Sequence, residues 1–323
     1  MSELGKTENY ALIVGMGATG FSIAQFLAKN GRAFHVFDTR ASSSLEAKFQ
    51  QHFPLAKQYF EQIDDEILLG AQTLYLSPGV ARDDATVSKA IQSGIETVGD
   101  VALFLQNTTA PVIGITGSNG KSTVTTMVGL AAEAAGLRVG VGGNIGKPAL
   151  ELLDEPQDVI VLELSSFQLE STEHANLNVA CHLNVSPDHM DRYDSLKHYV
   201  MTKQRIYNGA QHAVYCLDDP STQPPSTHSA KRYGFGLSKG LEAKEKQFVF
   251  SPENGWLQSG ADQLIHKDDI RIKGVHNVSN ALALFAIADA AGIDRNACRE
   301  VLRSFPGLPH RCELVAEYAG VTY

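Results

Sequence analysis

The segment from Gly114 to Thr126 constrains most strongly what this chain can fold into. It reads GITGSNGKSTVTT, and it follows the apolar run at 111–113 and precedes a helix-like stretch. Glycines let backbone N–H groups converge on phosphate oxygens, and the following helix adds the positive end of its dipole. Lys121 supplies a mobile cation, and Ser122 can ligate Mg2+. The segment therefore predicts a strand, a phosphate-binding loop and a helix that bind a nucleoside triphosphate.

The spacing of this loop is narrower than the general phosphate-loop pattern. In G-x-x-x-x-G-K-[ST] the first glycine would fall at Ile115, whereas the glycines stand at Gly114 and Gly117. The pattern T-G-x-x-G-K-S fits instead. A glycine-rich loop that only turns the chain is the alternative, but it would not explain the strand before it, the Lys-Ser-Thr within it and the helix after it.

Composition limits the class of protein. A chain of 323 residues with 43% hydrophobic content can bury two cores, which favours two domains. The net charge of −9 disfavours nucleic acid as a partner, and a nucleotide must be held by local donors and metal. Four cysteines without C-x-x-C spacing fit a reducing compartment. With no leader-like N-terminus and no run of about 18 apolar residues, we expect a soluble, cytoplasmic protein without membrane insertion.

The N-terminal region has a Rossmann-type opening. A buried strand at 10–14 leads into GMGATG, with Gly15, Gly17 and Gly20, and then into a helical pattern at 21–29. The next strand, at 33–37, ends at Asp38, where an acidic residue can meet a ribose hydroxyl. Three interpretations stay open: a dinucleotide site, for which a unit closing near residue 100 is short, a site for another nucleotide's diphosphate, and a structural tight turn.

Strands and helices keep alternating after the phosphate loop. Apolar strands are predicted at 138–141, 159–163, 179–185 and 213–217, which implies a parallel sheet covered by helices. The polar stretch 239–269, with a strand at 247–250, suggests an antiparallel insertion. An alanine-rich helix at 279–291 should stop at Gly292. The predicted fold class is α/β: a Rossmann-like N-terminal domain, then a P-loop-type central ATPase domain with a mostly parallel sheet and a small antiparallel insertion.

Several polar residues stand where ligands of such a fold bind. Glu163 ends an apolar strand, at the edge where parallel sheets form their ligand crevice, and it suits a metal ligand. The loop at 183–193 carries carboxylates, His189 and an arginine, although a capped helix start with solvated charges explains it too. Asn144, in GGNIG, could present its amide to a ligand or close a turn. Lys203, from its own surroundings, reads as a solvated helix charge.

Six motifs together give a family resemblance. They are TGSNGKST, GGNIG, LELSSFQLE, LNVSPDHMDRY, HNVSNA and GLPHR, and they resemble the Mur ligases over residues 10–323. The segment ELSSFQL at 163–169 and the Rossmann-like first domain are similar to the D-glutamate-adding members, rather than to their sister ligases or to folylpolyglutamate synthase.

The resemblance implies an ATP-dependent amide ligase of peptidoglycan precursor synthesis in the cytoplasm. Such an enzyme uses ATP to phosphorylate the carboxylate of UDP-N-acetylmuramoyl-L-alanine to an acyl phosphate. The amine of D-glutamate then attacks, and phosphate leaves. The implied cofactors are ATP and Mg2+, the implied partners are these small-molecule substrates, and the implied state is a monomer.

The resemblance also implies roles for individual residues. Lys121, Glu163, His189 and Lys203 would be catalytic. ATP would be bound by Gly117, Ser118, Asn119, Gly120, Lys121, Ser122, Thr123, Asn277, Asn280 and Arg311. The UDP substrate would be bound by Thr19, Asp38, Thr39, Arg40, Ser77, Gly79, Asn144, Ser165 and His189. Mg2+ would be held by Ser122, Glu163, His189 and, once carbamylated, Lys203, which would reverse the interpretation of Lys203 as a solvated charge.

On this basis three domains are expected. Residues 1–100 would form the UDP-substrate-binding domain, 101–311 the central ATP-binding domain, and 312–323 the start of a C-terminal domain. The family continues beyond this point into a third domain that closes the site and holds D-glutamate. The stretch 313–323 resembles a hairpin cut within its second strand, so we expect this chain to bind its substrates but to ligate poorly or not at all.

Overall fold

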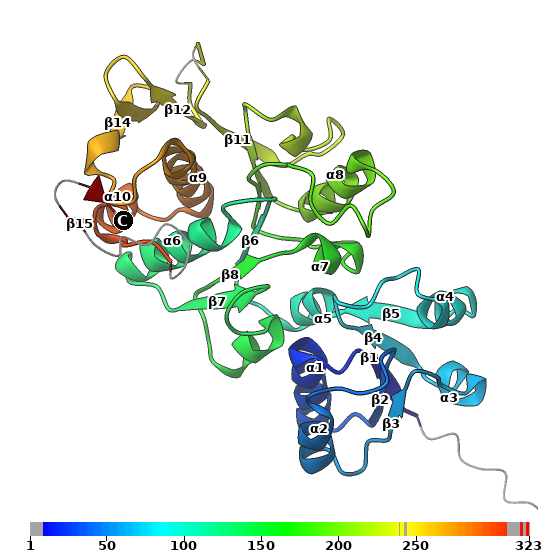
Figure 1. Cartoon of the computed structure of the whole chain (residues 1–323). Coiled ribbons are helices and arrows are strands. Elements are labelled where there is room, and N and C mark those ends of the chain that lie inside the picture. Colours follow the sequence, from blue (N-terminus) through cyan, green and yellow to red (C-terminus); the bar gives the residue numbers. More distant parts are fainter. Residues whose placement is uncertain (1–8, 239, 242–243, 309–316, 319–320, 323) are drawn as a thin grey trace, which may run out of the picture. The chain divides into compact units, whose positions relative to one another are not determined.

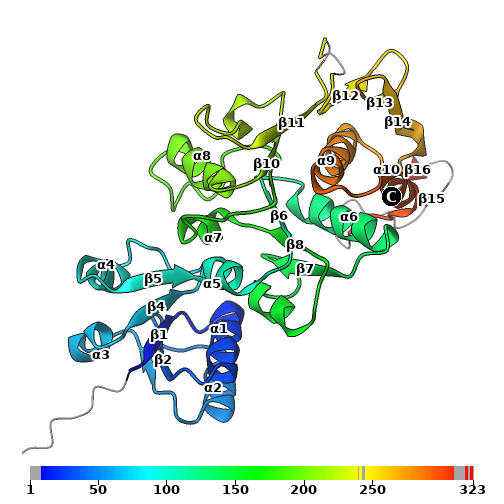
Figure 2. The same ribbon diagram turned by 180° about the vertical axis from the view of Figure 1, so that it is seen from behind.

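The computed structural model describes residues 9–238, 240–241, 244–308, 317–318 and 321–322. The chain forms two compact units (Figures 1 and 2). The first comprises Met1–Thr108, Lys147–Asp154 and Phe167–Glu173, and the second comprises Thr109–Gly146, Glu155–Ser166 and His174–Tyr323. In the part of the chain that is described, none of the helices combines the length and apolar composition needed to cross a membrane.

The first unit is built on a five-stranded parallel sheet in the order β3-β2-β1-β4-β5. Its strands are β1 (Ala11–Val14), β2 (Phe34–Asp38), β3 (Gln58–Phe60), β4 (Thr73–Leu76) and β5 (Glu96–Gly99). Its helices are α1 (Ala18–Lys29), α2 (Glu46–His52), α3 (Asp65–Leu69), α4 (Ala85–Gln92) and α5 (Asp100–Asn107). The residues of β1, β2 and β4 are all buried, as strands of a covered sheet must be. The Rossmann-like prediction is confirmed.

The first unit is larger than the expected 1–100. It includes α5, and it recruits two segments from later in the chain. The 3-10 helix η1 (Ala149–Asp154) packs against α1 and α5. In the other segment, Gln168 Nε2 donates to the buried Asp100 Oδ2 at 3.0 Å. Composition and local pattern mark boundaries along the chain, so they do not reveal excursions that return to an earlier core.

The second unit contains a nine-stranded sheet in the order β14-β13-β12-β11-β10-β9-β6-β8-β7. Neighbours from β7 to β12 are parallel, while β13 and β14 add antiparallel strands to the same sheet, so the expected antiparallel insertion extends its edge. The strands are β6 (Val112–Thr116), β7 (Val139–Gly143), β8 (Val159–Glu163), β9 (Val179–His182), β10 (His212–Cys216), β11 (Lys231–Gly236), β12 (Gln247–Ser251), β13 (Trp256–Ser259) and β14 (Asp262–His266).

Helices α6 (Lys121–Ala134), α9 (Val275–Ala291) and α10 (Arg295–Ser304) pack together against this sheet and form its largest core (Figures 1 and 2). Helix α9 is buried on nearly all sides and ends at Gly292, whose φ of 74° is the left-handed C-cap predicted for it. The other helical elements are α7 (Ser166–Glu170), α8 (Leu196–Gln204), η2 (Arg205–Tyr207), η3 (Pro220–Thr222) and η4 (Lys267–Asp269).

The segment expected to open a third domain, 312–323, lies largely outside the described residues. Within it, β15 (Glu317–Tyr318) and β16 (Val321–Thr322) pair antiparallel.

Candidate functional site

The phosphate loop joins the C-terminal end of β6 to the start of α6. Strand β6 lies between β8 and β9. The strands that follow it in the chain, β7 and β8, lie on one side of it, and β9 and β10 lie on the other, so the strand order reverses here. Ligand crevices form at such reversals in open parallel sheets. Gly120 has φ 80°, and a Cβ there would lie 2.7 Å from Asn280 Oδ1. The positive φ favours glycine, and a side chain here would have to displace the Asn280 amide. The predicted strand, loop and helix are therefore present.

Lys121 folds over the loop that precedes it. Its Nζ donates to the carbonyl oxygens of Gly117 at 2.9 Å and Ser118 at 3.0 Å. Ser122, the next residue, is only 5% exposed. The lysine thus keeps a positive charge at the mouth of the loop, on a flexible side chain that can exchange carbonyl oxygens for phosphate oxygens.

A pocket of about 320 Å³ opens beside the loop. It brings together the loop, the carboxyl ends of β7 and β8, and the start of α9. Among the expected ATP residues, Asn277 and Asn280 line it, and Asn280 Nδ2 donates to Asn277 Oδ1 at 3.1 Å. Arg311 lies outside the described residues. The lining consists of Ser118, Asn119, Gly120, Lys121, Thr123, Asn144, Glu163, Ile272, His276, Asn277, Asn280 and Gly307.

Glu163 presents one carboxylate oxygen without a partner. Its side chain is 2% exposed; Oε1 accepts from Asn144 Nδ2 at 2.8 Å, while Oε2 has no hydrogen-bond partner among the described residues. Such an oxygen is costly unless a cation or donor meets it. The described residues contain no group of three or more His, Cys, Asp or Glu side chains that could cage a metal. Mg2+ fits this environment, because it uses one or two carboxylates together with water and phosphate oxygens.

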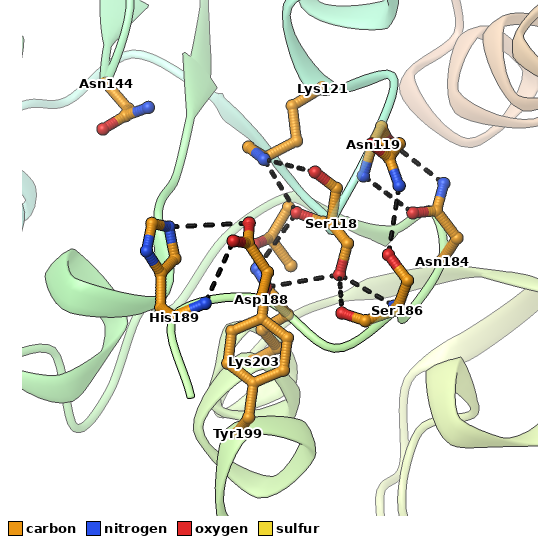
Figure 3. Close-up of polar contacts among 12 residues, drawn as sticks. Ser118, Asn119, Lys121, Asn144, Asn184, Ser186, Asp188, His189, Tyr199 and Lys203 are labelled. Carbon is orange, nitrogen blue, oxygen red and sulfur yellow. Dashed lines mark hydrogen bonds and ion pairs between the residues drawn. The ribbon is translucent and has the colours of Figure 1, made fainter. Parts of the chain in front are cut away.

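Lys203 is buried, which corrects the interpretation of it as a solvated helix charge. Its side chain is 1% exposed, and Nζ donates to the Gly117 carbonyl oxygen at 3.0 Å (Figure 3). Nζ also lies 4.7 Å from the centre of the Tyr199 ring. Burial, and then the charge of Lys121, lower the pKa of Lys203 to about 7. The local sequence gave no sign of this, because the carbonyl oxygen that accepts from Lys203 comes from the distant phosphate loop.

His189 lies on the loop that follows β9, and its backbone has the unusual φ of 53°. Its N–H donates to Asp188 Oδ1 at 3.0 Å, and its Nε2 lies 3.5 Å from Asp188 Oδ2. The side chain is about half exposed. Of the described residues that line the pocket beside the phosphate loop, none comes from 183–193.

In the first unit, the residues expected to bind UDP gather at the carboxyl edge of the sheet. Asp38 ends β2, and its Oδ2 accepts from Met16 N at 2.7 Å. Arg40 donates to both of its oxygens at 2.8 Å. Burial raises the pKa of Asp38, but the hydrogen bonds from Arg40 and Met16 outweigh it, so the pKa is lowered overall. Because these donors already occupy both oxygens, Asp38 is poorly placed to accept from a ribose hydroxyl in the manner of dinucleotide enzymes.

The neighbouring loop after β1 is tightly packed on one side and open on the other. A Cβ at Gly20 would lie 1.9 Å from the Gly15 carbonyl oxygen, whereas a Cβ at Gly17 would meet nothing within 4 Å. Ser77, at the end of β4, donates to that same carbonyl at 3.1 Å. The other expected residues are arranged around this edge or after β8: Thr19 in the first turn of α1, the exposed Thr39 and Gly79, and the half-buried Ser165.

Three contacts of the phosphate loop were not predicted. Asn184, Ser186 and Tyr199 hold Ser118 and Asn119 from the other side of the loop (Figure 3). The motif LNVSPDHMDRY contains Asn184 and Ser186, but nothing in it indicates that they face the loop. His276, which lines the pocket, likewise lies in the motif HNVSNA, whose asparagines alone were expected to act.

Comparison with known proteins agrees with this architecture. The Mur ligase middle domain matches residues 115–288, and the N-terminal domain of the MurD-like Mur ligases matches residues 9–99. UDP-N-acetylmuramoylalanine–D-glutamate ligase of Saccharophagus degradans is 49% identical over 100% of this chain and 72% of its own length. The enzyme of the same name from Pseudomonas aeruginosa is 41% identical over 98% of this chain and 70% of its own length.

Solved structures share the fold at lower identity. UDP-N-acetylmuramate:L-alanyl-gamma-D-glutamyl-meso-diaminopimelate ligase from Neisseria meningitides has a TM-score of 0.62 and 19% identity, with 93% of this chain and 99% of that chain covered. UDP-N-acetylmuramate–alanine ligase from Thermotoga maritima has a TM-score of 0.57 and 19% identity, with 96% and 71% covered. Two Mur ligase domains match this chain, and relatives 41–49% identical to it cover 98–100% of its length. The chain therefore belongs to the Mur ligase family.

Proposed function

We propose that this chain carries the ATP-binding and UDP-substrate-binding units of a ligase that joins D-glutamate to UDP-N-acetylmuramoyl-L-alanine in peptidoglycan precursor synthesis. The observation that carries the proposal is the pocket in which the phosphate loop, Asn277, Asn280 and the unpartnered oxygen of Glu163 meet. Relatives 41–49% identical to this chain are UDP-N-acetylmuramoylalanine–D-glutamate ligases, which supports the choice of amino acid and acceptor.

In the proposed reaction, a carboxylate oxygen of the muramoyl-alanine attacks the γ-phosphorus of ATP. This produces an acyl phosphate and ADP. The neutral amine of D-glutamate then attacks the acyl carbon, and phosphate leaves with the electrons of the broken C–O bond. The nitrogen gives up one proton, to water or to the departing phosphate, to form the amide. Lys121 and the N–H groups of the loop offset the negative charge that collects on the transferred phosphoryl group. Asn277 and Asn280 orient the nucleotide from α9.

Glu163, Ser122, His189 and carbamylated Lys203 are the proposed Mg2+ contacts. When bound, the ion would neutralise charge on the phosphate oxygens. The role of the chain is to hold these donors in place: Asn144 occupies Oε1 of Glu163, while Oε2 has no partner among the described residues. Asn144, Ser165 and His189 would also contact the muramoyl end of the acceptor.

The first unit would anchor the acceptor by its uridine diphosphate. Arg40 is fixed by Asp38 yet exposed, so its remaining N–H groups can donate to a ligand at the carboxyl edge. Thr19, Thr39, Ser77 and Gly79 surround the same edge. ATP and UDP-linked precursors are cytoplasmic metabolites, and we propose a monomer acting there. That the present 323 residues bind both substrates but ligate poorly stays a prediction.

Titration calorimetry tests the proposal. We expect the chain to bind two ligands: a non-hydrolysable ATP analogue in its Mg2+ complex, and UDP-N-acetylmuramoyl-L-alanine. Lys121→Ala should abolish only the first of these, and Arg40→Ala should weaken only the second. If the UDP-linked acceptor does not bind at about millimolar concentration, which corresponds to roughly 4 kcal/mol, the assignment of the first unit is wrong.

A further inference from the structure

The side chains of Ser118 and Asn119, in the phosphate loop, form hydrogen bonds within the protein that a residue serving only to bind a nucleotide would not need. Ser118 Oγ donates to the Ser186 carbonyl oxygen and accepts from Ser186 N, both at 2.9 Å. The same oxygen lies 3.2 Å from Tyr199 Oη. Because the single hydroxyl hydrogen of Ser118 is directed to Ser186, Tyr199 acts as the donor in that contact. Ser118 therefore has no hydrogen left to donate to a phosphate.

Asn119 forms a reciprocal pair with Asn184. Asn119 N donates to Asn184 Oδ1 at 2.8 Å, and Asn184 Nδ2 donates back to the Asn119 carbonyl oxygen at 3.0 Å (Figure 3). The Asn119 side chain adds a bond from Nδ2 to Ser186 Oγ at 3.1 Å, and Ser118 N donates to the Asn184 carbonyl oxygen at 3.0 Å. Six hydrogen bonds thus join two loop residues to two residues of the segment after β9.

The segment that receives these bonds continues into Asp188 and His189. It is fixed at one further point, where Val185 N donates to Asp219 Oδ2 at 2.8 Å. Between these anchors and His189 lie only a few residues, and His189 itself has a left-handed φ that is costly for a residue with a side chain. A short, strained segment tied to the phosphate loop at one end must respond when that loop moves.

We propose that Asn184 and Ser186 are positioning residues that couple the occupancy of the phosphate loop to the placement of His189. This inference rests on the proposed function, since it needs a nucleotide at the loop. In it, nucleotide phosphates are held by loop N–H groups and Lys121, while the side chains of Ser118 and Asn119 transmit the loop's position to the segment 184–189. Neither Asn184 nor Ser186 touches the reacting atoms.

Hydrogen exchange of the whole chain, read by mass spectrometry with and without adenosine triphosphate, tests the coupling. The nucleotide is added in EDTA, so that no metal can connect the loop to His189 directly. We expect slower exchange both in the loop at 117–123 and in the segment 184–189. In Asn184→Ala the loop should still be protected while the response of 184–189 falls at least threefold. Asn184→Asp, which replaces the Nδ2 donor with a charged oxygen, should also lower this response.

Asp294→Ala is the matched control. Asp294 caps α10 through a 3.0 Å bond to Asn296 N, so its removal costs a bond of the same kind in the same unit without touching the loop. Its 184–189 response should equal that of the wild type. Asn119→Ala, which removes only the bond to Ser186 Oγ, gives a second variant if Asn184→Ala does not fold.

The possible results are distinct. If the wild type shows no protection at 117–123 either in EDTA or, in a parallel sample, with the Mg2+ complex of the nucleotide, nucleotide binding itself fails, and the proposed function falls together with the coupling. If the loop is protected but 184–189 does not respond, the coupling is wrong and the function stands. An unchanged 184–189 response in Asn184→Asp and Asn119→Ala would overturn the coupling in the same way.

Discussion

Asn144 holds Glu163 by two hydrogen bonds, from its side-chain Nδ2 to Oε1 at 2.8 Å and from its backbone N to the Glu163 carbonyl oxygen at 2.9 Å. Glu163 ends β8, and Asn144 directly follows the last residue of the neighbouring strand β7. That last residue is Gly143, where a Cβ would lie 2.4 Å from the same Glu163 carbonyl oxygen. Glu163 therefore lines the pocket with Oε1 held by Asn144 and with Oε2 unpartnered among the described residues.

Asn144→Ala should weaken Mg2+-dependent nucleotide binding by about 10- to 100-fold, the usual cost of removing a residue that orients a metal ligand. Calorimetry with the ATP analogue, once with Mg2+ and once with EDTA, separates an effect on the metal from an effect on the nucleotide. The affinity in EDTA should change little. Glu163→Gln should lose the Mg2+ enhancement altogether. An Asn144→Ala chain with the same Mg2+ enhancement as the wild type would show that Glu163 needs no support.

Gly120→Ala should abolish nucleotide binding, because the added Cβ meets Asn280 at 2.7 Å in a backbone conformation with φ 80°. Gly136→Ala is the matched control: its φ is 86°, but nothing lies within 4 Å of the added Cβ. Both variants should lose about 1 kcal/mol or more of stability from the backbone conformation. Only Gly120→Ala should lose affinity for the ATP analogue, and equal affinities in the two variants would contradict the steric argument.

Lys203→Ala should lose ligase activity, and short carboxylates such as acetate should partly restore it. The variant is tested in a ligase that has the full length of the relatives. The reason is that a carbamylated Lys203 would act as a carboxylate donor, for which a free carboxylate can substitute. Lys197→Ala, an exposed lysine on the same helix, is the control and should keep its activity. Steady-state phosphate release measures both variants, and wild-type turnover of Lys203→Ala would remove this residue from the site.

Arg40→Ala should weaken the binding of the UDP-linked acceptor by about 10-fold or more, the effect of one lost charge-assisted hydrogen bond. Arg32→Ala removes the same charge near the opposite edge of the sheet, where Arg32 donates to Tyr75 Oη at 2.6 Å. Calorimetry should therefore find acceptor affinity unchanged in Arg32→Ala. Similar losses in both variants would point to net charge rather than to a contact.

Asp100 should make the first unit less stable as the pH rises. Burial raises its pKa to about 6, against its ordinary 3.8, so the folded state binds the proton more tightly than the unfolded state. Its protonated form contributes stability that is complete below about pH 4 and is lost as the pH rises through 6. Asp100→Asn, which mimics the protonated acid, should therefore be more stable than the wild type at pH 8, by at most about 3 kcal/mol.

Urea unfolding of both chains at pH 4, 6 and 8 measures this difference, which should shrink toward pH 4. Asp158→Asn is a control of the opposite kind, since hydrogen bonds from Arg138 lower the pKa of Asp158 to about 2. Its difference from the wild type should be constant between pH 6 and 8. An Asp100→Asn advantage that does not depend on pH would mean that Asp100 is not the titrating group.

The sequence by itself determined the α/β class, the alternation of strands and helices along the chain, the phosphate loop and the stop of α9 at Gly292. These features follow from local periodicity and from glycines at fixed positions, which act over a few residues. It also placed Glu163 and Asp38 at strand ends, because every parallel strand of such a sheet ends at the same edge.

Only the tertiary structure decided how these groups are used. Lys203 is buried by a carbonyl 86 positions earlier in the chain, and Asn119 meets Asn184 across 65 positions. The first unit gains segments 147–154 and 167–173 from beyond its expected end. Hydrogen bonds and desolvation depend on distance in space, so the pKa of Lys203, the free oxygen of Glu163 and the contacts of the phosphate loop arise only when the chain has folded.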